Sequence, residues 1–182
     1  MSHRRVYEIA FVGLKPGIHH FEYSINNKFF ESYGEQEFSN CTATVKLQLE
    51  KNTGFMMLKF DVGGQLEVSC DRCGNPLPLQ LWDEFKLLVK MVEEPEVMNE
   101  QEEDPDVYYI SRGESHLRVA DWIYEFINLS LPMQKMCPEE KIGSDYCNKE
   151  ALEMLKKIGN PSLTTDNAIW KGLEKIKKNL DN

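Results

Sequence analysis

A pair of cysteines separated by two residues is the clearest chemical feature of this sequence. It lies in the stretch SCDRCG at positions 69–74, where Gly74 follows Cys70 and Cys73. A C-x2-C turn places two sulfurs on one side of a metal ion, and a following glycine lets the backbone curl back. Zinc prefers four tetrahedral ligands, so this turn would supply half of a zinc site.

The second half of such a site has to come from the other cysteines. Cys137 and Cys147 are separated by nine residues, in a loop that contains proline and glycine between two predicted helices. Cys41 instead begins a predicted strand and has no cysteine near it in the sequence. We therefore predict a structural zinc site whose ligands are Cys70, Cys73, Cys137 and Cys147.

The energetics allow this pairing of distant segments. Bringing residue 73 to residue 137 closes a loop of about 64 residues, at a cost of about 3.7 kcal/mol. Structural zinc sites contribute on the order of 10 kcal/mol or more, so a metal ion would outweigh that cost.

Three other interpretations of the cysteines remain open. Cys137 and Cys147 could be ordinary packing thiols beside a plain turn, or the C-x2-C pair could be redox-active. A redox pair of the thioredoxin type begins a helix, whereas this one lies between predicted strands. A catalytic zinc with one open position would need a carboxylate base, which Asp71, Glu139 or Asp145 could supply.

Size and composition indicate a globular protein. The 182 residues are 41% hydrophobic and 28% charged, which suits one compact unit with a tail. The N-terminus lacks a signal-peptide pattern and no apolar run approaches membrane-spanning length. We therefore expect a cytoplasmic protein with reduced thiols and no membrane partner, a setting in which C-x2-C usually means metal or redox chemistry.

Charge is distributed unevenly along the chain. The net charge of −9 disfavours a surface that coats nucleic acid, and positions 93–106 hold eight acids and no basic residue. Positions 149–182 instead hold seven lysines and five acids. A final helix capped by Asp166 presents four lysines that could bind a protein or RNA partner, or could simply face solvent: Lys171, Lys175, Lys177 and Lys178.

The sequence contains none of the common nucleotide-binding or hydrolase motifs. G-x-G-x-x-G, the P-loop and G-x-S-x-G are all missing. We therefore predict no small-molecule substrate and no catalytic residues.

Hydrophobic periodicity predicts an α+β fold, with an antiparallel β-sheet or partly open barrel in the N-terminal two thirds and helices in the C-terminal third. We expect a single domain over 1–182, divided into mainly strands at 5–92 and 107–110, an acidic flexible loop at 93–106, a helix at 115–131 and a helical tail at 148–180.

Some local features are also predicted. Residues 7–11 alternate like a strand, and the adjacent Gly63 and Gly64 favour a turn or bulge. In the 115–131 helix, Trp122 and Phe126 could form an aromatic edge for a partner, although packing beneath a strand is the more common arrangement.

Several longer stretches resemble the bacterial YceD family, named for large ribosomal RNA subunit accumulation. They are CDRCGNPLPLQL, then DWIYEFINLSLPMQKMC with a later cysteine, and also FFESYG at positions 29–34. Many members carry further cysteines after the Leu-Pro pair, whereas this sequence has only Cys137 and Cys147 there.

The resemblance implies a non-enzymatic cytoplasmic protein that supports normal levels of large-subunit ribosomal RNA through ribosome assembly or RNA processing. Its partner would be a ribosomal protein or a pre-ribosomal particle, with direct RNA contact possible. The alternative function is a zinc-dependent RNA-processing hydrolase.

Overall fold

A computed structural model describes residues 4–138 and 147–159 of the chain. The chain divides into two compact units, each of which is described by itself. We call Met1–Ser69 with Pro76–Lys135 the sheet unit, and Cys70–Asn75 with Met136–Asn182 the cysteine unit. The single domain predicted over 1–182 stays a prediction. In the described ranges, no helix is long and apolar enough to span a membrane.

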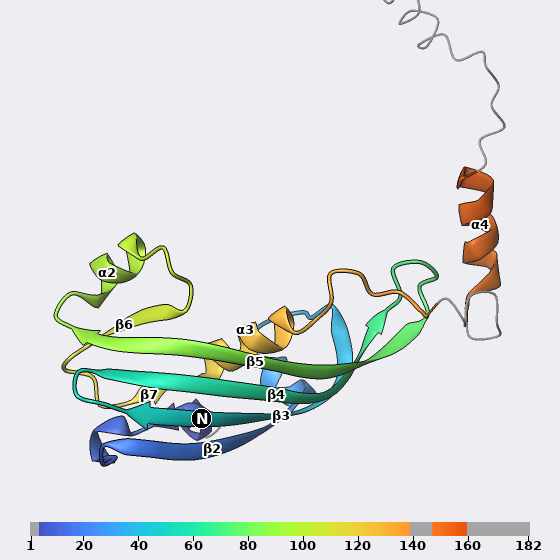
Figure 1. The fold of residues 1–182 in the computed structure, drawn as a ribbon. Coiled ribbons are helices and arrows are strands. Elements are labelled where there is room, and N and C mark those ends of the chain that lie inside the picture. Colours follow the sequence, from blue (N-terminus) through green and yellow to red (C-terminus); the bar gives the residue numbers. More distant parts are fainter. Residues whose placement is uncertain (1–3, 139–146, 160–182) are drawn as a thin grey trace, which may run out of the picture. The chain divides into compact units, whose positions relative to one another are not determined.

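The sheet unit is built on five strands in the order β2-β3-β4-β5-β6. All neighbouring strands are antiparallel except β5 and β6, which are parallel. The α+β prediction is confirmed, and the sheet is open at β2 and β6 instead of closing into a barrel (Figure 1). The strands are β2 (Gly17–Asn26), β3 (Phe38–Lys51), β4 (Phe55–Ser69), β5 (Pro76–Val92) and β6 (Val107–Ser111).

The core lies between one face of this sheet and helix α3, Ala120–Leu129 (Figure 1). Leu47, Phe60 and Phe85 are cross-strand partners on that face. The ring of Phe126 stacks on Phe85 at 4.4 Å between centroids and meets Phe60 edge-on at 4.9 Å. The expectation that Phe126 packs beneath a strand is therefore confirmed, and this aromatic contact anchors the helix to the sheet.

A second aromatic cluster fixes α3 from the side of α1, Asn27–Phe30. Tyr33, just after α1, stacks on Tyr124 of α3 at 4.1 Å between ring centroids. The Tyr33 hydroxyl also donates a hydrogen bond of 2.9 Å to Asp121. Burial, followed by this hydrogen bond, raises the pKa of Tyr33, so the hydroxyl stays protonated and able to donate.

Two predictions near the ends of the sheet unit are wrong. Residues 7–11 do not form one strand, and α3 does not begin near Ser115. Instead a short strand, β1 (Glu8–Ile9), pairs with β7 (Leu117–Arg118) and takes residues that the periodicity had assigned to the helix. Two 3-10 helices, η1 (Arg4–Tyr7) and η2 (Phe11–Gly13), flank β1.

The acidic stretch predicted as a flexible loop contains a helix, α2, at Pro95–Gln101. Proline suits the first turn of a helix and Glu96 favours its positive end, which explains why the helix forms here. The side chain of Asn99 bonds both the N–H and the C=O of Tyr109, at 2.8 and 2.9 Å. This amide therefore takes the place of a neighbouring strand at the edge of β6.

Strand β4 runs unbroken through Gly63 and Gly64, where the sequence favoured a turn or bulge. The irregularity lies on the neighbouring strand, where the register shifts between Ser39 and Thr42. Gly64 has a φ of 146°, and a Cβ on it would lie 2.4 Å from the carbonyl oxygen of Thr42. The β3 backbone thus approaches β4 so closely at this point that only glycine fits.

Helix α4, Lys149–Gly159, belongs to the cysteine unit. Asn148 caps it, accepting a hydrogen bond of 3.2 Å from the Ala151 N–H. Leu155 and Ile158 of this helix are 46% and 74% exposed. Their exposure has a simple reason: the described part of this unit contains no apolar core for them to join.

The predicted last helix, its Asp166 cap and the four lysines that it carries lie outside the described residues.

The close approach at Gly64 gives a stability prediction. Replacing Gly64 with Ala adds a Cβ against the Thr42 carbonyl and strains a positive φ, so we expect the free energy of unfolding to fall by about 1 to 3 kcal/mol. Gly63→Ala is the matched control, because nothing lies within 4 Å of its Cβ position. Urea denaturation of the two variants measures the difference, and equal midpoints would contradict the constraint at Gly64.

Candidate metal centre

The turn that joins β4 to β5 in the chain presents the first two cysteines. Gly74 has a φ of 74°, and its N–H donates to the Cys70 carbonyl at 2.8 Å. The Cys70 N–H donates to the Asn75 carbonyl at 2.9 Å, which closes the turn. The glycine after the second cysteine is therefore required by its left-handed backbone, as the sequence suggested.

The structure brings a third cysteine to this turn. The Sγ atoms of Cys70, Cys73 and Cys137 all lie within 4.8 Å of one another. The Sγ of Cys137 is 3.2 Å from that of Cys70 and 3.7 Å from that of Cys73. Tetrahedral zinc with bonds near 2.3 Å holds its sulfurs about 3.8 Å apart, so this spacing is close to that of a ligand set.

The fourth predicted ligand, Cys147, lies next to Cys137. Its side chain hydrogen-bonds to the Cys137 thiol and contributes to raising the Cys137 pKa. The complete four-cysteine site stays a prediction, while three of its members are brought together directly. Cys41 is buried in β3, where burial raises its pKa to about 11, as expected of an inert packing thiol.

Burial shows how much the cysteine unit relies on these side chains. Its described residues include four buried side chains, and all four are cysteines, each between 2% and 4% exposed: Cys70, Cys73, Cys137 and Cys147. Folded segments normally bury apolar residues to offset the entropy of ordering the chain. A unit whose described interior consists of sulfur alone therefore fits a metal-stabilised module.

Hydrogen bonds to sulfur prepare the site for negative charge. Burial alone would raise the pKa of Cys70, but hydrogen bonds from Cys137 and from the backbone N–H groups of Arg72 and Cys73 outweigh it and lower that pKa. The Cys137 N–H reaches the Cys70 sulfur at 3.3 Å. Burial and the neighbouring thiols raise the pKa of Cys137. The cluster thus favours one thiolate at Cys70, and a metal ion would favour more.

Arg72 is a member of the centre that sequence reasoning missed. It lies between the two cysteines of the turn, and its guanidinium donates a 2.7 Å hydrogen bond to the Cys137 carbonyl. Its Nε is the one buried side-chain N or O atom among the described residues that has no hydrogen-bond partner. Its position between the two cysteines could have indicated this role from the sequence, because a positive charge there offsets the negative charge of thiolates.

The alternatives to a structural metal have less support from this geometry. Packing in an apolar core does not explain four cysteines in a unit whose described residues bury no apolar side chain besides them. A redox pair needs two sulfurs, whereas a third lies within reach of both. Of the carboxylates that a hydrolase could use, Asp71 is exposed, and Glu139 and Asp145 lie outside the described residues.

A comparison with protein-family models matches residues 58–177, more than half of the chain, to the large ribosomal RNA subunit accumulation protein YceD. The chain belongs to the YceD family. The match covers the C-x2-C turn, Cys137 and Cys147, and it begins later than the resemblance seen in the sequence, within β4. Neither a curated protein nor a solved structure matches the chain.

Membership in the YceD family implies a role in the accumulation of large-subunit ribosomal RNA. The three close, buried cysteines of this member could hold a metal ion. This member of the family therefore contains a candidate metal centre.

The cluster of buried sulfurs predicts that the purified protein contains metal and that this metal is lost when Cys137 is replaced. Protein purified without added zinc should carry about one zinc ion per chain, and Cys137→Ser should lose most of it, because the turn cysteines alone make only half a site. Elemental analysis of purified protein measures this.

Cys41→Ser is the matched control, because it also removes a buried thiol but lies in β3 and outside the cluster. It should retain the metal. The far-UV signal of the strands should survive in Cys137→Ser, since the sheet unit has its own core. A variant that keeps its zinc without Cys137, or a wild-type protein free of metal, would contradict the assignment.

Proposed function

We propose that this protein is a non-enzymatic ribosome-assembly factor of the cytoplasm that supports accumulation of large-subunit ribosomal RNA, with one structural zinc ion held by Cys70, Cys73, Cys137 and Cys147. Its membership in the YceD family carries the ribosomal role. The sulfur-only interior of the described cysteine unit supports the zinc. Each part has its own test.

A structural role for the metal suits the ligand set better than a catalytic one. Four cysteine ligands form a closed tetrahedral shell, and a closed shell leaves no coordination position for water or substrate. The cysteines are nearly fully buried, which also keeps solvent from the ion. The zinc would bind the 70–75 turn to Cys137 and Cys147. Because Cys147 lies just before α4, the ion would also hold the start of this helix close to the turn.

The proposed partner is a ribosomal protein or a pre-ribosomal particle. A net charge of −9 repels RNA and attracts the basic proteins that bind it. Any direct contact with RNA would be made by the lysines at positions 171, 175, 177 and 178, which lie outside the described residues. Protein contact is therefore the primary expectation.

A test in cells separates the ribosomal role from the metal. Removing the gene should lower the amount of large-subunit ribosomal RNA relative to small-subunit RNA, because the matching family is described by the accumulation of large-subunit ribosomal RNA. Complementation with wild-type protein or Cys41→Ser should restore the ratio, measured by quantifying both RNAs.

Cys137→Ser should fail to restore it, and its cellular level should fall several-fold, since a protein that loses its stabilising metal is degraded more quickly. Sedimentation of cell extract should place the wild-type protein in fractions that contain pre-ribosomal particles. An unchanged RNA ratio in cells without the gene, together with no protein in those fractions, would refute the ribosomal role.

A further inference from the structure

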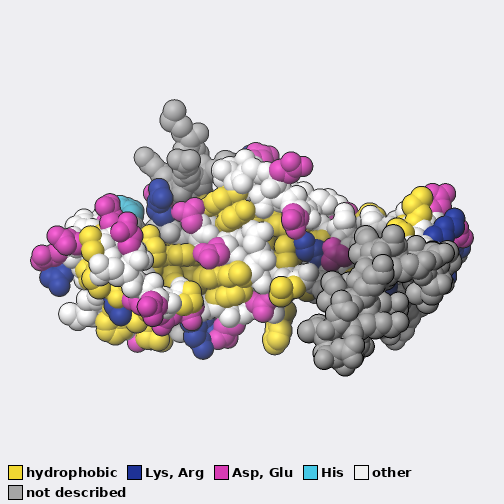
Figure 2. All heavy atoms as spheres, turned by 90° about the horizontal axis from the view of Figure 1, so that it is seen from above, with side chains coloured by type: hydrophobic (Ala, Val, Ile, Leu, Met, Phe, Trp, Pro, Cys, Tyr) yellow, Lys and Arg dark blue, Asp and Glu magenta, His cyan; other side chains and the backbone are white. Residues whose placement is uncertain are grey.

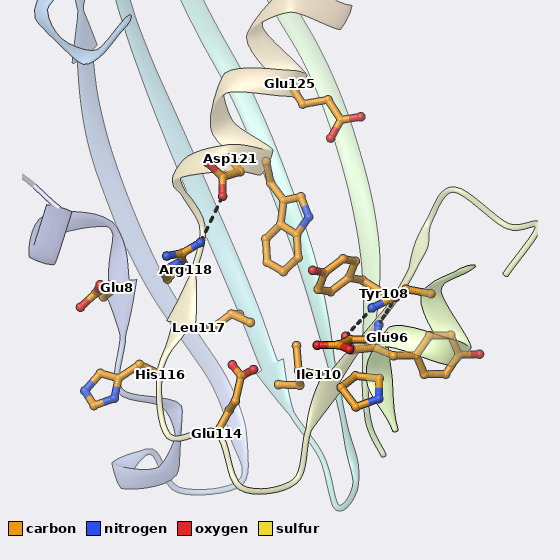
Figure 3. A pocket seen from close by; sticks show the side chains of 14 residues that line it. Glu8, Glu96, Tyr108, Ile110, Glu114, His116, Leu117, Arg118, Asp121 and Glu125 are labelled. Atoms are coloured by element: carbon orange, nitrogen blue, oxygen red, sulfur yellow. Dashed lines mark hydrogen bonds and ion pairs between the residues drawn. The ribbon is translucent and has the colours of Figure 1, made fainter. Parts of the chain in front are cut away.

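An open pocket in the sheet unit lies away from the cysteines in the sequence. Its volume is about 780 Å³, within the usual range for binding sites of small molecules or peptide side chains. It is lined by residues of α2 and β6 and by the segment from Glu114 to Glu125, with Glu8 of β1 alongside (Figure 3). All of these elements belong to one compact unit.

The pocket is strongly acidic. Five carboxylates line it against one arginine, Arg118, so its formal charge is −4 when His116 is neutral. Arg118 reaches only Asp121, at 3.7 Å, and the other four carboxylates form no ion pair among the described residues. Figure 2 shows acidic side chains around apolar ones on one face of the molecule. The five carboxylates are Glu8, Glu96, Glu114, Asp121 and Glu125.

Two aromatic rings stand among these charges. Tyr108 is 41% exposed, and its ring meets that of Trp122 edge-on, with centroids 5.3 Å apart and planes at 85°. Perpendicular rings leave parts of their faces open. The face of a tyrosine or tryptophan ring attracts a guanidinium or ammonium group, and guanidinium groups are the more frequent partners. Aromatic faces beside unpaired carboxylates are thus suited to basic side chains.

Contacts behind the pocket hold its lining in place. Asp121 accepts the hydrogen bond from Tyr33, and Tyr109, next to Tyr108, is fixed by Asn99. Because Asn99 occupies the backbone groups of Tyr109, a partner cannot pair with β6 at that residue as an added strand. Recognition would therefore depend on the side chains that line the pocket, which are already in position.

We propose that this pocket binds an arginine- and lysine-rich segment of a partner protein. The negative charge of the pocket selects against RNA and favours a basic segment, and the aromatic pair gives it a surface on which to stack. The inference goes beyond the proposed function. Only the statement that the segment belongs to a ribosomal protein would rest on that function.

The test uses calorimetric titration of the full-length protein with a short synthetic peptide rich in arginine. Replacing Glu96, Glu114 and Glu125 with Gln should weaken binding about tenfold, because each exposed charge pair contributes a factor of roughly two to three. These residues are exposed and unpaired among the described residues, so the variant should keep the wild-type melting temperature. Tyr108→Leu should weaken binding several-fold more for the arginine peptide than for a lysine peptide.

The matched control replaces Glu93, Glu100 and Glu103 with Gln, which changes the net charge equally on exposed residues that do not line the pocket. It should alter affinity less than twofold. Equal weakening in both triple variants, or no binding of the peptide to wild-type protein, would overturn the proposal.

Two further outcomes name a different occupant and would also overturn it. A single-stranded RNA oligonucleotide that binds wild-type protein and loses affinity in the pocket variant would assign the pocket to RNA. The lysines at 171, 175, 177 and 178 can also be replaced with Gln. If the peptide binds only after this replacement, the chain's own tail is the occupant of the pocket. Because every arm uses purified protein, failure here leaves the ribosomal role intact.

Discussion

The main physical constraint on this protein lies in the cysteine unit. Its described residues bury four cysteines and no other side chain, so interactions of the sulfurs must hold it together. Cys70 and Cys73 are separated from Cys137 by more than sixty residues, and closing a loop of that length costs about 3.7 kcal/mol. The thiol contacts seen there could not offset that cost and the ordering of the turn, since individual hydrogen bonds contribute about 1 kcal/mol net. A metal ion could.

The sheet unit is stabilised in a different way. Its strands alternate buried and exposed residues, and Phe126 of α3 packs between Phe60 and Phe85. Hydrophobic burial stabilises this unit. The C-x2-C turn follows β4 and precedes β5 in the chain. A segment whose buried side chains are cysteines is therefore connected directly to two strands that are stabilised by hydrophobic burial.

The sequence was informative where the signal is local. Alternation predicted the long strands, and the C-x2-C-Gly pattern predicted the turn, including the left-handed Gly74. The proximity of Cys137 was also predictable, because few chemical roles suit a reduced cysteine pair with further cysteines downstream. Arg72 was visible too, but its role depends on a carbonyl 65 positions away.

The features that sequence reasoning missed depend on long-range contacts. The pairing of Glu8–Ile9 with Leu117–Arg118 replaced both a predicted strand and the start of a predicted helix, and no short window contains both partners. The closeness of Gly64 to Thr42 depends on a register shift in another strand. The pocket likewise gathers residues from four separated segments, so its charge is spread along the sequence.

Electrostatics links this acidic chain to a role in ribosomal RNA accumulation. A protein with a charge of −9 is repelled by the RNA whose level its family supports, and salt at physiological strength screens that repulsion only beyond about 8 Å. The cations that neutralise ribosomal RNA include basic protein segments, which an acidic pocket can compete for or deliver. Under the proposed function, an acidic protein would therefore act on the basic proteins that bind the RNA, and through them on the stability of the RNA.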